Sequence, residues 1–129
     1  MVRGDVNKIT IGDRVNIQDG AVIHTLYQRS VTEIGNDVSI GHNANVHGAK
    51  IEDKCLIGMG ATVLDHAVVG TGSIVAANSL VLTGMVIEPG SVYAGVPARR
   101  VKGVTPEQVR DIIERTARDY MMYASWYKE

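Results

Sequence analysis

The sequence predicts an all-β solenoid, a parallel β-helix built from six-residue units, and three observations lead to this prediction. Aliphatic residues recur every six positions along most of the chain, and a smaller side chain usually follows four positions after each. The 129 residues include 14 glycines and no phenylalanine, which fits a core too narrow for a large aromatic ring. A period of six is neither the 3.6 of an amphipathic helix nor the 2 of an alternating strand.

The six-residue period runs from Ile11 to Ile87. The recurring aliphatic residues are Ile11, Ile17, Ile23, Ile34, Ile40, Val46, Ile51, Ile57, Val63, Val69, Val75, Val81 and Ile87. The smaller residues that follow them are Val15, Ala21, Val38, Ala44, Cys55, Ala61, Ala67, Ser73, Ser79, Met85 and Ser91. One such unit buries little surface, so three units, about 18 residues, should form one triangular coil on which the next coil stacks.

Two gaps interrupt the period, eleven residues after Ile23 and five residues after Val46. If the longer gap is one unit plus a five-residue insertion, Ile23, Ile34 and Ile40 begin the three sides of one coil. Val46 then lies directly above Ile23 in the next coil.

This count also positions the histidines. His24 and His47 each follow an aliphatic residue of the same side, so they should stack in adjacent coils about 4.8 Å apart. His42 falls on a different side, directly above Asp19, and Arg3 falls one coil below His24.

Imidazoles on two sides of one prism cannot easily converge on one ion. In a homotrimer, however, His24 and His47 of one subunit could meet His42 of its neighbour. Three imidazoles with an open fourth position are the ligand set of a catalytic zinc. We therefore predict a metal site at a subunit interface, with zinc as the first choice and iron or cobalt as alternatives. His66 we interpret as a solvated side chain.

Several motifs resemble the gamma-class carbonic anhydrase family, including its ferripyochelin-binding-protein-like branch, and the similarity covers essentially the whole chain. The motifs are Arg3-Gly4-Asp5, Asn16-Ile17-Gln18-Asp19-Gly20, His24 and His42-Asn43-Ala44-Asn45-Val46-His47-Gly48. The resemblance implies a left-handed coil, an exception to the usual right-handed crossover. It also implies a trimer whose interfaces hold metal on the three matching histidines, and reversible hydration of carbon dioxide to bicarbonate.

Five residues in the same columns of the coil are candidates for positions around the metal, and for Gln18 the resemblance also implies the role. Gln18 would hydrogen-bond the reactive water, and Arg3 and Asp19 would form an ion pair between subunits that shapes the pocket or captures bicarbonate. Asp5 and Asn16 would hold this network. Residues of this kind orient metal ligands and tune the metal.

Two acidic positions of active family members have no counterpart here. Val6 follows Asp5, and the loop after His24 has no carboxylate before Glu33. Because carbon dioxide hydration must also release a proton, we expect slow or absent turnover even with an intact metal site.

Two other functions stay open at this stage. The segment Gly95-Val96-Pro97-Ala98 resembles the exit segment of many proteins of this superfamily, acetyltransferases included. The basic residues after it, Arg99, Arg100 and Lys102, could meet coenzyme A phosphates in an acyltransferase or thioesterase, or could lie on a solvated stretch leading off the coil. The third possibility is a metal-binding scaffold with little catalysis.

We expect a β-helix domain over residues 1–103 and a C-terminal helix over 104–129. Thr105, Pro106 and Gln108 form a capping-box start signal. The helix has an apolar stripe that should pack on the coil or on a neighbouring subunit: Val109, Ile112, Ile113, Ala117, Tyr120, Met121, Ala124 and Tyr127.

Composition narrows the class of partner. A net charge of -1 gives no basic surface for nucleic acid. No segment has the apolar length of a membrane span, and no secretory pattern is present, so we expect a cytoplasmic protein that acts on a small molecule. The single cysteine, Cys55, occupies an inward position of the repeat and should behave as a small buried hydrophobe.

Overall fold

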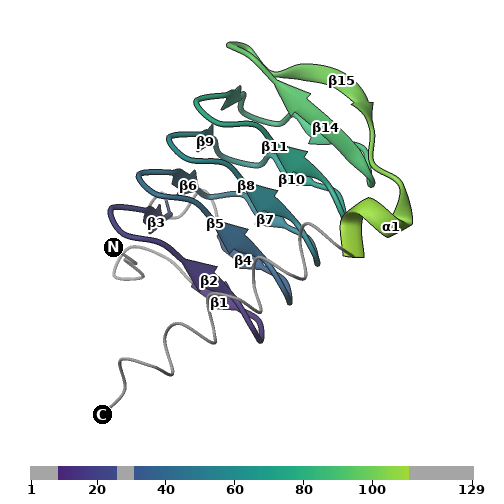
Figure 1. The fold of residues 1–129 in the computed structure, drawn as a ribbon. Helices are drawn as coiled ribbons and strands as arrows, with labels where there is room; N and C mark the ends of the chain where they lie inside the picture. Colours follow the sequence, from purple (N-terminus) through teal and green to yellow (C-terminus); the bar gives the residue numbers. More distant parts are fainter. Residues whose placement is uncertain (1–8, 26–30, 111–129) are drawn as a thin grey trace.

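The computed structural model describes residues 9–25 and 31–110, and in it the chain winds as a triangular coil of short strands (Figure 1). Sheet A contains β3 (Val22–His24), β6 (Asn45–His47), β9 (Thr62–Val63) and β12 (Leu80–Val81). Sheet B contains β1 (Ile9–Ile11), β4 (Thr32–Ile34), β7 (Lys50–Ile51), β10 (Val68–Val69) and β13 (Val86–Ile87). Sheet C contains β2 (Asn16–Ile17), β5 (Ser39–Ile40), β8 (Leu56–Ile57), β11 (Ile74–Val75), β14 (Ser91–Ala94) and β15 (Arg99–Gly103).

The strands pair in the register that the six-residue period predicts. Ile17 pairs with Ile40 in sheet C, and Ile23 pairs with Val46 in sheet A, so the eleven-residue gap is one unit plus an insertion. All these pairings between successive coils are parallel. The expected left-handed parallel β-helix is confirmed.

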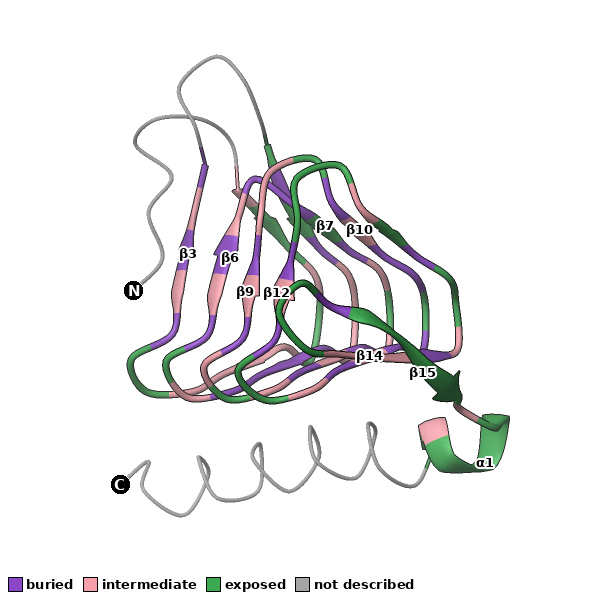
Figure 2. Cartoon of the chain, turned by 90° about the horizontal axis from the view of Figure 1, so that it is seen from above, coloured by how far each residue is buried: buried purple, intermediate pink, exposed green. Residues whose placement is uncertain are grey.

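Inward side chains of the three sheets form one continuous core. Figure 2 shows the sides of the coil with buried residues recurring along each of them. The inward column of sheet A, made of Ile23, Val46, Val63 and Val81, is fully buried. Ile11 differs, because it lies in the first described coil and is 38% exposed. Ile87, in the last strand of sheet B, is fully buried, so the exposure of Ile11 is confined to the first described coil.

Corners between the sheets require an unusual backbone conformation every six residues. Positive φ angles occur at Arg14, Gly20, Asp37, Asn43, Gly48, Lys54, Gly60, His66, Gly72, Asn78, Gly84 and Gly90. Close stacking imposes a second constraint just before His42. A Cβ atom at Gly41 would stand 2.7 Å from the backbone nitrogen of Met59 in the next coil, so only glycine fits there.

The end of the coil differs from the sequence-based expectation. The sequence leaves the basic stretch after Ala98 open, as a solvated segment or as a contact for coenzyme A phosphates, and indicates no strand there; residues 99–103 form β15, which pairs antiparallel with β14. The turn is held against sheet A, because the amide of Ala98 donates to the carbonyl of Leu80 (2.8 Å) and the amide of Leu80 donates to the carbonyl of Gly95 (3.0 Å). The strand is exposed along its length, as expected for its basic residues.

The predicted helix start is confirmed. In α1 (Pro106–Gln108) the Thr105 hydroxyl accepts from the amide of Gln108, and the Gln108 side chain accepts from the amide of Thr105. The rest of the predicted helix, residues 111–129, lies outside the described residues. Among the described residues, no helix has the length and apolar character needed to span a membrane.

Candidate metal centre

Two of the three predicted ligands lie together at the edge of sheet A that leads to sheet B. His24 ends β3 and His47 ends β6, and the two residues are register partners. Their ring centroids are 3.8 Å apart, with the ring planes at 86°. The prediction that these histidines stack in adjacent coils is confirmed.

The backbone around this pair is fixed from the buried side. The Thr32 hydroxyl donates to the carbonyl of His24 (2.9 Å) and accepts from the amide of Gly48 (3.0 Å). The same amide also donates to the carbonyl of His24 (2.9 Å). Thr32 is fully buried. Through these two hydrogen bonds it fixes the ends of β3 and β6 at the point where the coil resumes after the insertion.

A carboxylate from the next coil contacts His47. Asp65 follows β9, and its Oδ1 lies 2.6 Å from Nδ1 of His47. Sequence reasoning missed this residue. The available signal was weak, because Asp65 stands 18 residues after His47 and the coil at this point has only 17 residues, so that Asp65 falls one column beside His47.

His42 lies at the opposite edge of sheet A, at the corner that joins it to sheet C. It follows β5, and the amide of Asn43 donates to the carbonyl of Asp19 (3.2 Å) in the coil below. Gln18 lies at the same corner, with its amide donating to the carbonyl of Ile40 (3.0 Å). The register thus places Asp19 beneath His42, as predicted.

The two edges of sheet A are too far apart for one ion to bridge them within a chain. His47 stands five positions after His42 along mostly extended chain, which spans on the order of 10–15 Å. Zinc requires its nitrogen ligands at about 2.0–2.1 Å. Accordingly, residues 9–25 and 31–110 contain no cluster of three potential ligands within one subunit.

The remaining predicted site residues are only partly placed. Arg3 and Asp5 lie outside the described residues. Asn16 lies on sheet C beside Ser39, and its Nδ2 is buried without a hydrogen-bond partner in the described part of the chain. The network proposed for these residues stays a prediction.

Other titratable residues belong to the fold and not to the histidine pair. Glu33, the first carboxylate after the loop, lies on sheet B opposite Lys50. His66 is exposed at a corner with a φ of 62°, as expected for a solvated histidine. Cys55 is buried, and burial raises the pKa of its thiol to about 12, so the expectation of an inert cysteine is confirmed.

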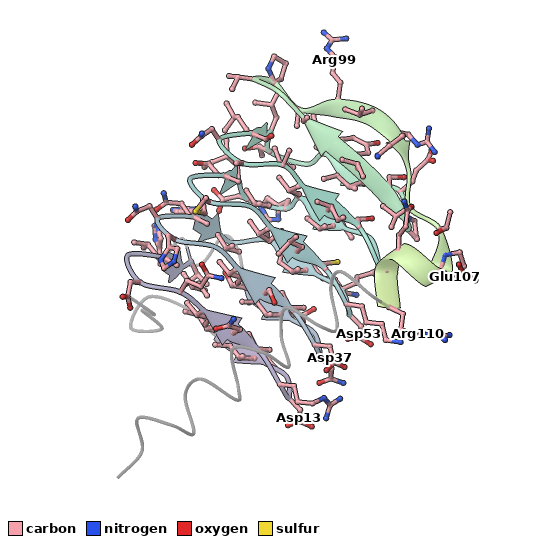
Figure 3. All side chains as sticks on the ribbon, viewed as in Figure 1. Asp13, Asp37, Asp53, Arg99, Glu107 and Arg110 are labelled. Carbon is pink, nitrogen blue, oxygen red and sulfur yellow. The ribbon has the colours of Figure 1, made fainter. Side chains whose placement is uncertain are left out.

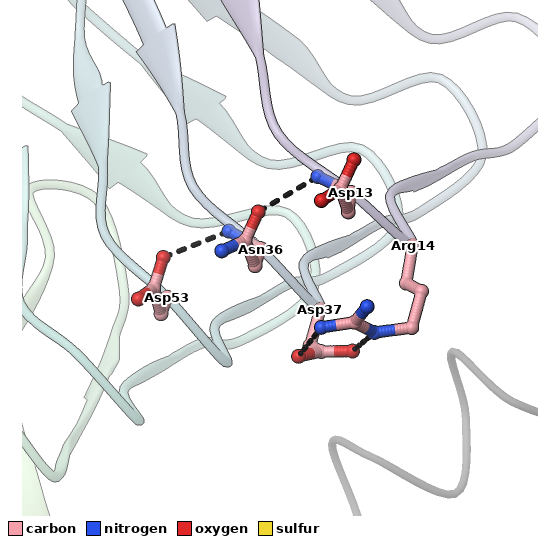
Figure 4. A network of polar contacts seen from close by, with 5 residues as sticks. All are labelled: Asp13, Arg14, Asn36, Asp37 and Asp53. Atoms are coloured by element: carbon pink, nitrogen blue, oxygen red, sulfur yellow. Dashed lines mark hydrogen bonds and ion pairs between the residues drawn. The ribbon is translucent and has the colours of Figure 1, made fainter.

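The corner between sheets B and C carries a ladder of polar contacts. Along this corner Asp13, Asp37 and Asp53 recur in successive coils (Figure 3). The amide of Asp13 donates to Oδ1 of Asn36 (2.7 Å), and the amide of Asn36 donates to Oδ1 of Asp53 (2.8 Å) (Figure 4). These contacts tie coil to coil far from the histidines.

An ion pair lies beside this ladder. The Arg14 guanidinium donates to both oxygens of Asp37, at 2.6 and 3.1 Å. This hydrogen-bonded pairing lowers the pKa of the Asp37 carboxyl and raises the pKa of Arg14.

Two cavities open on other parts of the described surface. One, of about 360 Å³, lies over sheet B and is lined by residues that include Glu33, Lys50 and Glu52. The other, of about 400 Å³, lies between α1 and the corner of sheets B and C. Neither of these two cavities is lined by a histidine.

The repeats and the coil define a hexapeptide-repeat protein. The family model described as "Bacterial transferase hexapeptide (six repeats)" matches residues 31–63 and 48–83. Among solved structures, a hexapeptide transferase family protein from Anaplasma phagocytophilum superposes with a TM-score of 0.90 at 36% identity, covering 98% of this chain and 73% of that one. A putative acetyltransferase from Bacillus cereus superposes with a TM-score of 0.70 at 27% identity, covering 98% and 95%.

Curated relatives narrow the class further. A protein of Methanocaldococcus jannaschii named "Probable carbonic anhydrase" is 57% identical over 92% of this chain and 74% of its own length. "Gamma carbonic anhydrase 1, mitochondrial" of Arabidopsis thaliana is 40% identical over 93% of this chain, which spans only 45% of that longer protein. The chain belongs to the gamma carbonic anhydrase family, an enzyme family of the lyase class.

Proposed function

We propose that this chain is a metal-dependent lyase that interconverts carbon dioxide and bicarbonate as a homotrimer. The metal, zinc in the first instance, would be held by His24 and His47 of one subunit and by His42 of the next. The observation that carries the proposal is the stacked pair of histidines at one edge of sheet A, with the third histidine at the opposite edge.

The position of the histidines at two edges of one sheet supports a threefold arrangement. If sheet A of each subunit faces the threefold axis, each subunit presents one edge to each neighbour. Such a heterologous contact closes into a ring of three, and residues at equal height along the coils then meet. His42 lies at the corner that leads into β6, and His47 ends β6, so the two histidines would lie at comparable heights.

The residues above the histidines fit the same contact. The register places Met59 above His42, and Leu64 and Leu82 above His47. Met59 is 56% exposed and Leu82 is 39% exposed in the single subunit. Facing one another across the interface, these apolar side chains would be buried together one and two coils above the metal.

A zinc ion on three imidazoles supplies, when bound, a water whose pKa falls toward about 7 and which is nucleophilic at neutral pH. The chain's own residues would hold the metal and set the surroundings of that water. Gln18 and Asp19 lie beside His42, so they would reach the site together with the ligand from the neighbouring subunit. Arg3, Asp5 and Asn16 would complete the network.

Hydration of carbon dioxide also releases a proton, and few acidic or basic side chains lie near the proposed metal to carry that proton away. Glu33 lies on sheet B and not beside the histidines, so it does not replace the acidic loop residues of active relatives. We therefore expect slower turnover than in relatives that carry those residues.

The test combines metal content with activity. Purified protein is loaded with zinc in air and, separately, with iron under reducing conditions, and both metal content per chain and carbon dioxide hydration are measured. We expect about one metal per chain, consistent with one site per interface, and hydration above the uncatalysed rate. His42→Ala should lose both metal and activity.

His66→Asn is the matched control, because it removes a histidine at a corner whose positive φ asparagine tolerates. It should keep both properties. A wild-type protein that binds no metal would overturn the proposal. Bound metal without activity under either condition would favour the scaffold, and turnover of an acyl-coenzyme A by metal-free protein would favour the acyltransferase or thioesterase.

A further inference from the structure

We propose that Asp65 is a positioning residue for the metal site, which holds the proton of His47 on Nδ1 and so directs Nε2 toward the metal. This inference rests on the proposed function, because it takes His47 as a ligand.

The contact is short and partly shielded from water. Oδ1 of Asp65 lies 2.6 Å from Nδ1 of His47, and the two side chains are only 16% and 20% exposed. A carboxylate can only accept a hydrogen bond, so the proton of the neutral imidazole lies on Nδ1. The lone pair of Nε2 is then free to bind a metal.

The ring of His47 is restrained on two sides. Asp65 holds it from the coil above, and the ring of His24 meets it from the coil below at a centroid distance of 3.8 Å. Both neighbours come from the same edge of sheet A. The orientation of this imidazole is therefore set before any metal binds.

Asp65 itself is held firmly by the backbone. The amide of Gly84 donates to its carbonyl (2.9 Å), and the amide of the next residue, His66, donates to the carbonyl of Gly48 (2.8 Å). The corner that carries the carboxylate is thus attached to the coils above and below. This gives the carboxylate a defined position relative to His47.

Metal-binding histidines often donate a hydrogen bond to a carboxylate, because this contact fixes the tautomer of the imidazole and raises its basicity as a ligand. Removing such a partner typically lowers metal affinity about 10–100-fold. We expect a loss of this size when Asp65 is replaced by alanine. Asp65→Asn should lose less, because its amide oxygen can still accept from Nδ1.

Two measurements on the full chain test the proposal. In the first, the dissociation constant for zinc is measured by competition with a chelator for the wild type, Asp65→Ala and Asp65→Asn. Asp53→Asn is the matched control, because Asp53 also accepts a hydrogen bond at a corner but lies far from the histidines. Its zinc affinity should equal that of the wild type.

In the second, nitrogen-15 spectra of the metal-free protein report which ring nitrogen of each of the four histidines carries the proton. His47→Gln assigns the signal. We expect the Nδ1-protonated form of His47 in the wild type and in Asp65→Asn, and a mixture of tautomers in Asp65→Ala. This readout does not depend on activity, and it keeps the test valid if the alanine variant folds poorly.

The outcomes separate this inference from the proposed function. Wild-type protein that binds no zinc would overturn the proposed function itself. Wild-type protein that binds zinc, with unchanged affinity in Asp65→Ala or with His47 protonated on Nε2, would overturn only the role of Asp65. An equal loss of affinity in Asp53→Asn would also overturn it, since the effect would then be one of coil stability.

Discussion

Replacing Met59 by glutamate should dissociate the proposed trimer. Met59 lies one coil above His42 and is 56% exposed in the single subunit. Full burial of a methionine side chain contributes about 1.5–3 kcal/mol, so burial of the exposed 56% is worth about 0.8–1.7 kcal/mol at each interface. Three interfaces therefore lose about 2.5–5 kcal/mol per trimer from apolar burial alone.

That loss corresponds to a factor of roughly 10² to several times 10³ in the trimer dissociation constant, because each 1.4 kcal/mol is tenfold. Burying a carboxylate adds a further penalty of several kcal/mol for each unpaired charge. Sedimentation velocity at micromolar protein concentration measures the change directly. We expect Met59→Glu to sediment as a monomer and to lose bound metal with the trimer.

Val86→Glu is the control, because Val86 is also exposed, at 64%, but lies on sheet B. It should stay trimeric. If Met59→Glu remained a trimer with full metal content, this edge of sheet A could not be the interface.

Three further predictions concern the coil itself. Ile57→Ala should lower the free energy of unfolding by about 2–5 kcal/mol, because Ile57 is fully buried in a middle coil. The measurement is a denaturant titration at fixed protein concentration, with Leu56→Ala, at a half-buried position, as the control. A loss for Ile57→Ala no larger than that for Leu56→Ala would count against the inward position of Ile57. Asp37→Asn should lower Tm at neutral pH, and the difference should vanish in acid. The pKa of the Asp37 carboxyl is lowered in the folded protein, so this group stabilises the fold above its ordinary pKa of about 3.9. The contribution is lost as the pH falls through the lowered pKa. A difference in Tm that persisted at pH 2 would therefore refute the role of the Arg14 pairing. Cys55 should resist iodoacetamide at pH 8 until the protein is denatured, because burial raises its pKa to about 12; rapid labelling of native protein would contradict its placement in the core.

The fold and the strand register could be predicted because the six-residue period is redundant. Each aliphatic residue from Ile17 to Ile87 supports the positions of its neighbours, so the count survives one insertion and one shortened unit. The same count brought His24 beside His47 and Asp19 beneath His42, since register alone decides these contacts.

The contact between Asp65 and His47 could not be predicted in this way. Asp65 stands 18 residues after His47, but the shortened unit after Val46 shifts the register by one position. Leu64 therefore lies directly above His47, and Asp65 lies in the adjacent column. The contact depends on how far the carboxylate reaches across columns, which the period does not specify.

Strand β15 was missed for a different reason. It pairs antiparallel with β14, so its residues follow no six-residue period. Two hydrogen bonds hold the turn before β15, one from the amide of Ala98 to the carbonyl of Leu80 and one from the amide of Leu80 to the carbonyl of Gly95. They join segments that come together only once the coil has formed.

The central claim is that each metal site takes ligands from two subunits, and mixed trimers test it most directly. His42→Ala and His47→Ala are co-expressed with different tags, and trimers that contain both are purified. Each parent alone lacks a ligand at every site. In a mixed trimer, one interface in three joins intact His24 and His47 of one chain to intact His42 of the other.

Metal content per chain is then compared with that of the parents and the wild type. We predict that purified mixed trimers bind about one third of the wild-type zinc, as the cyclic arrangement of a heterologous trimer requires. Mixed trimers that bind no more zinc than either parent would contradict the account.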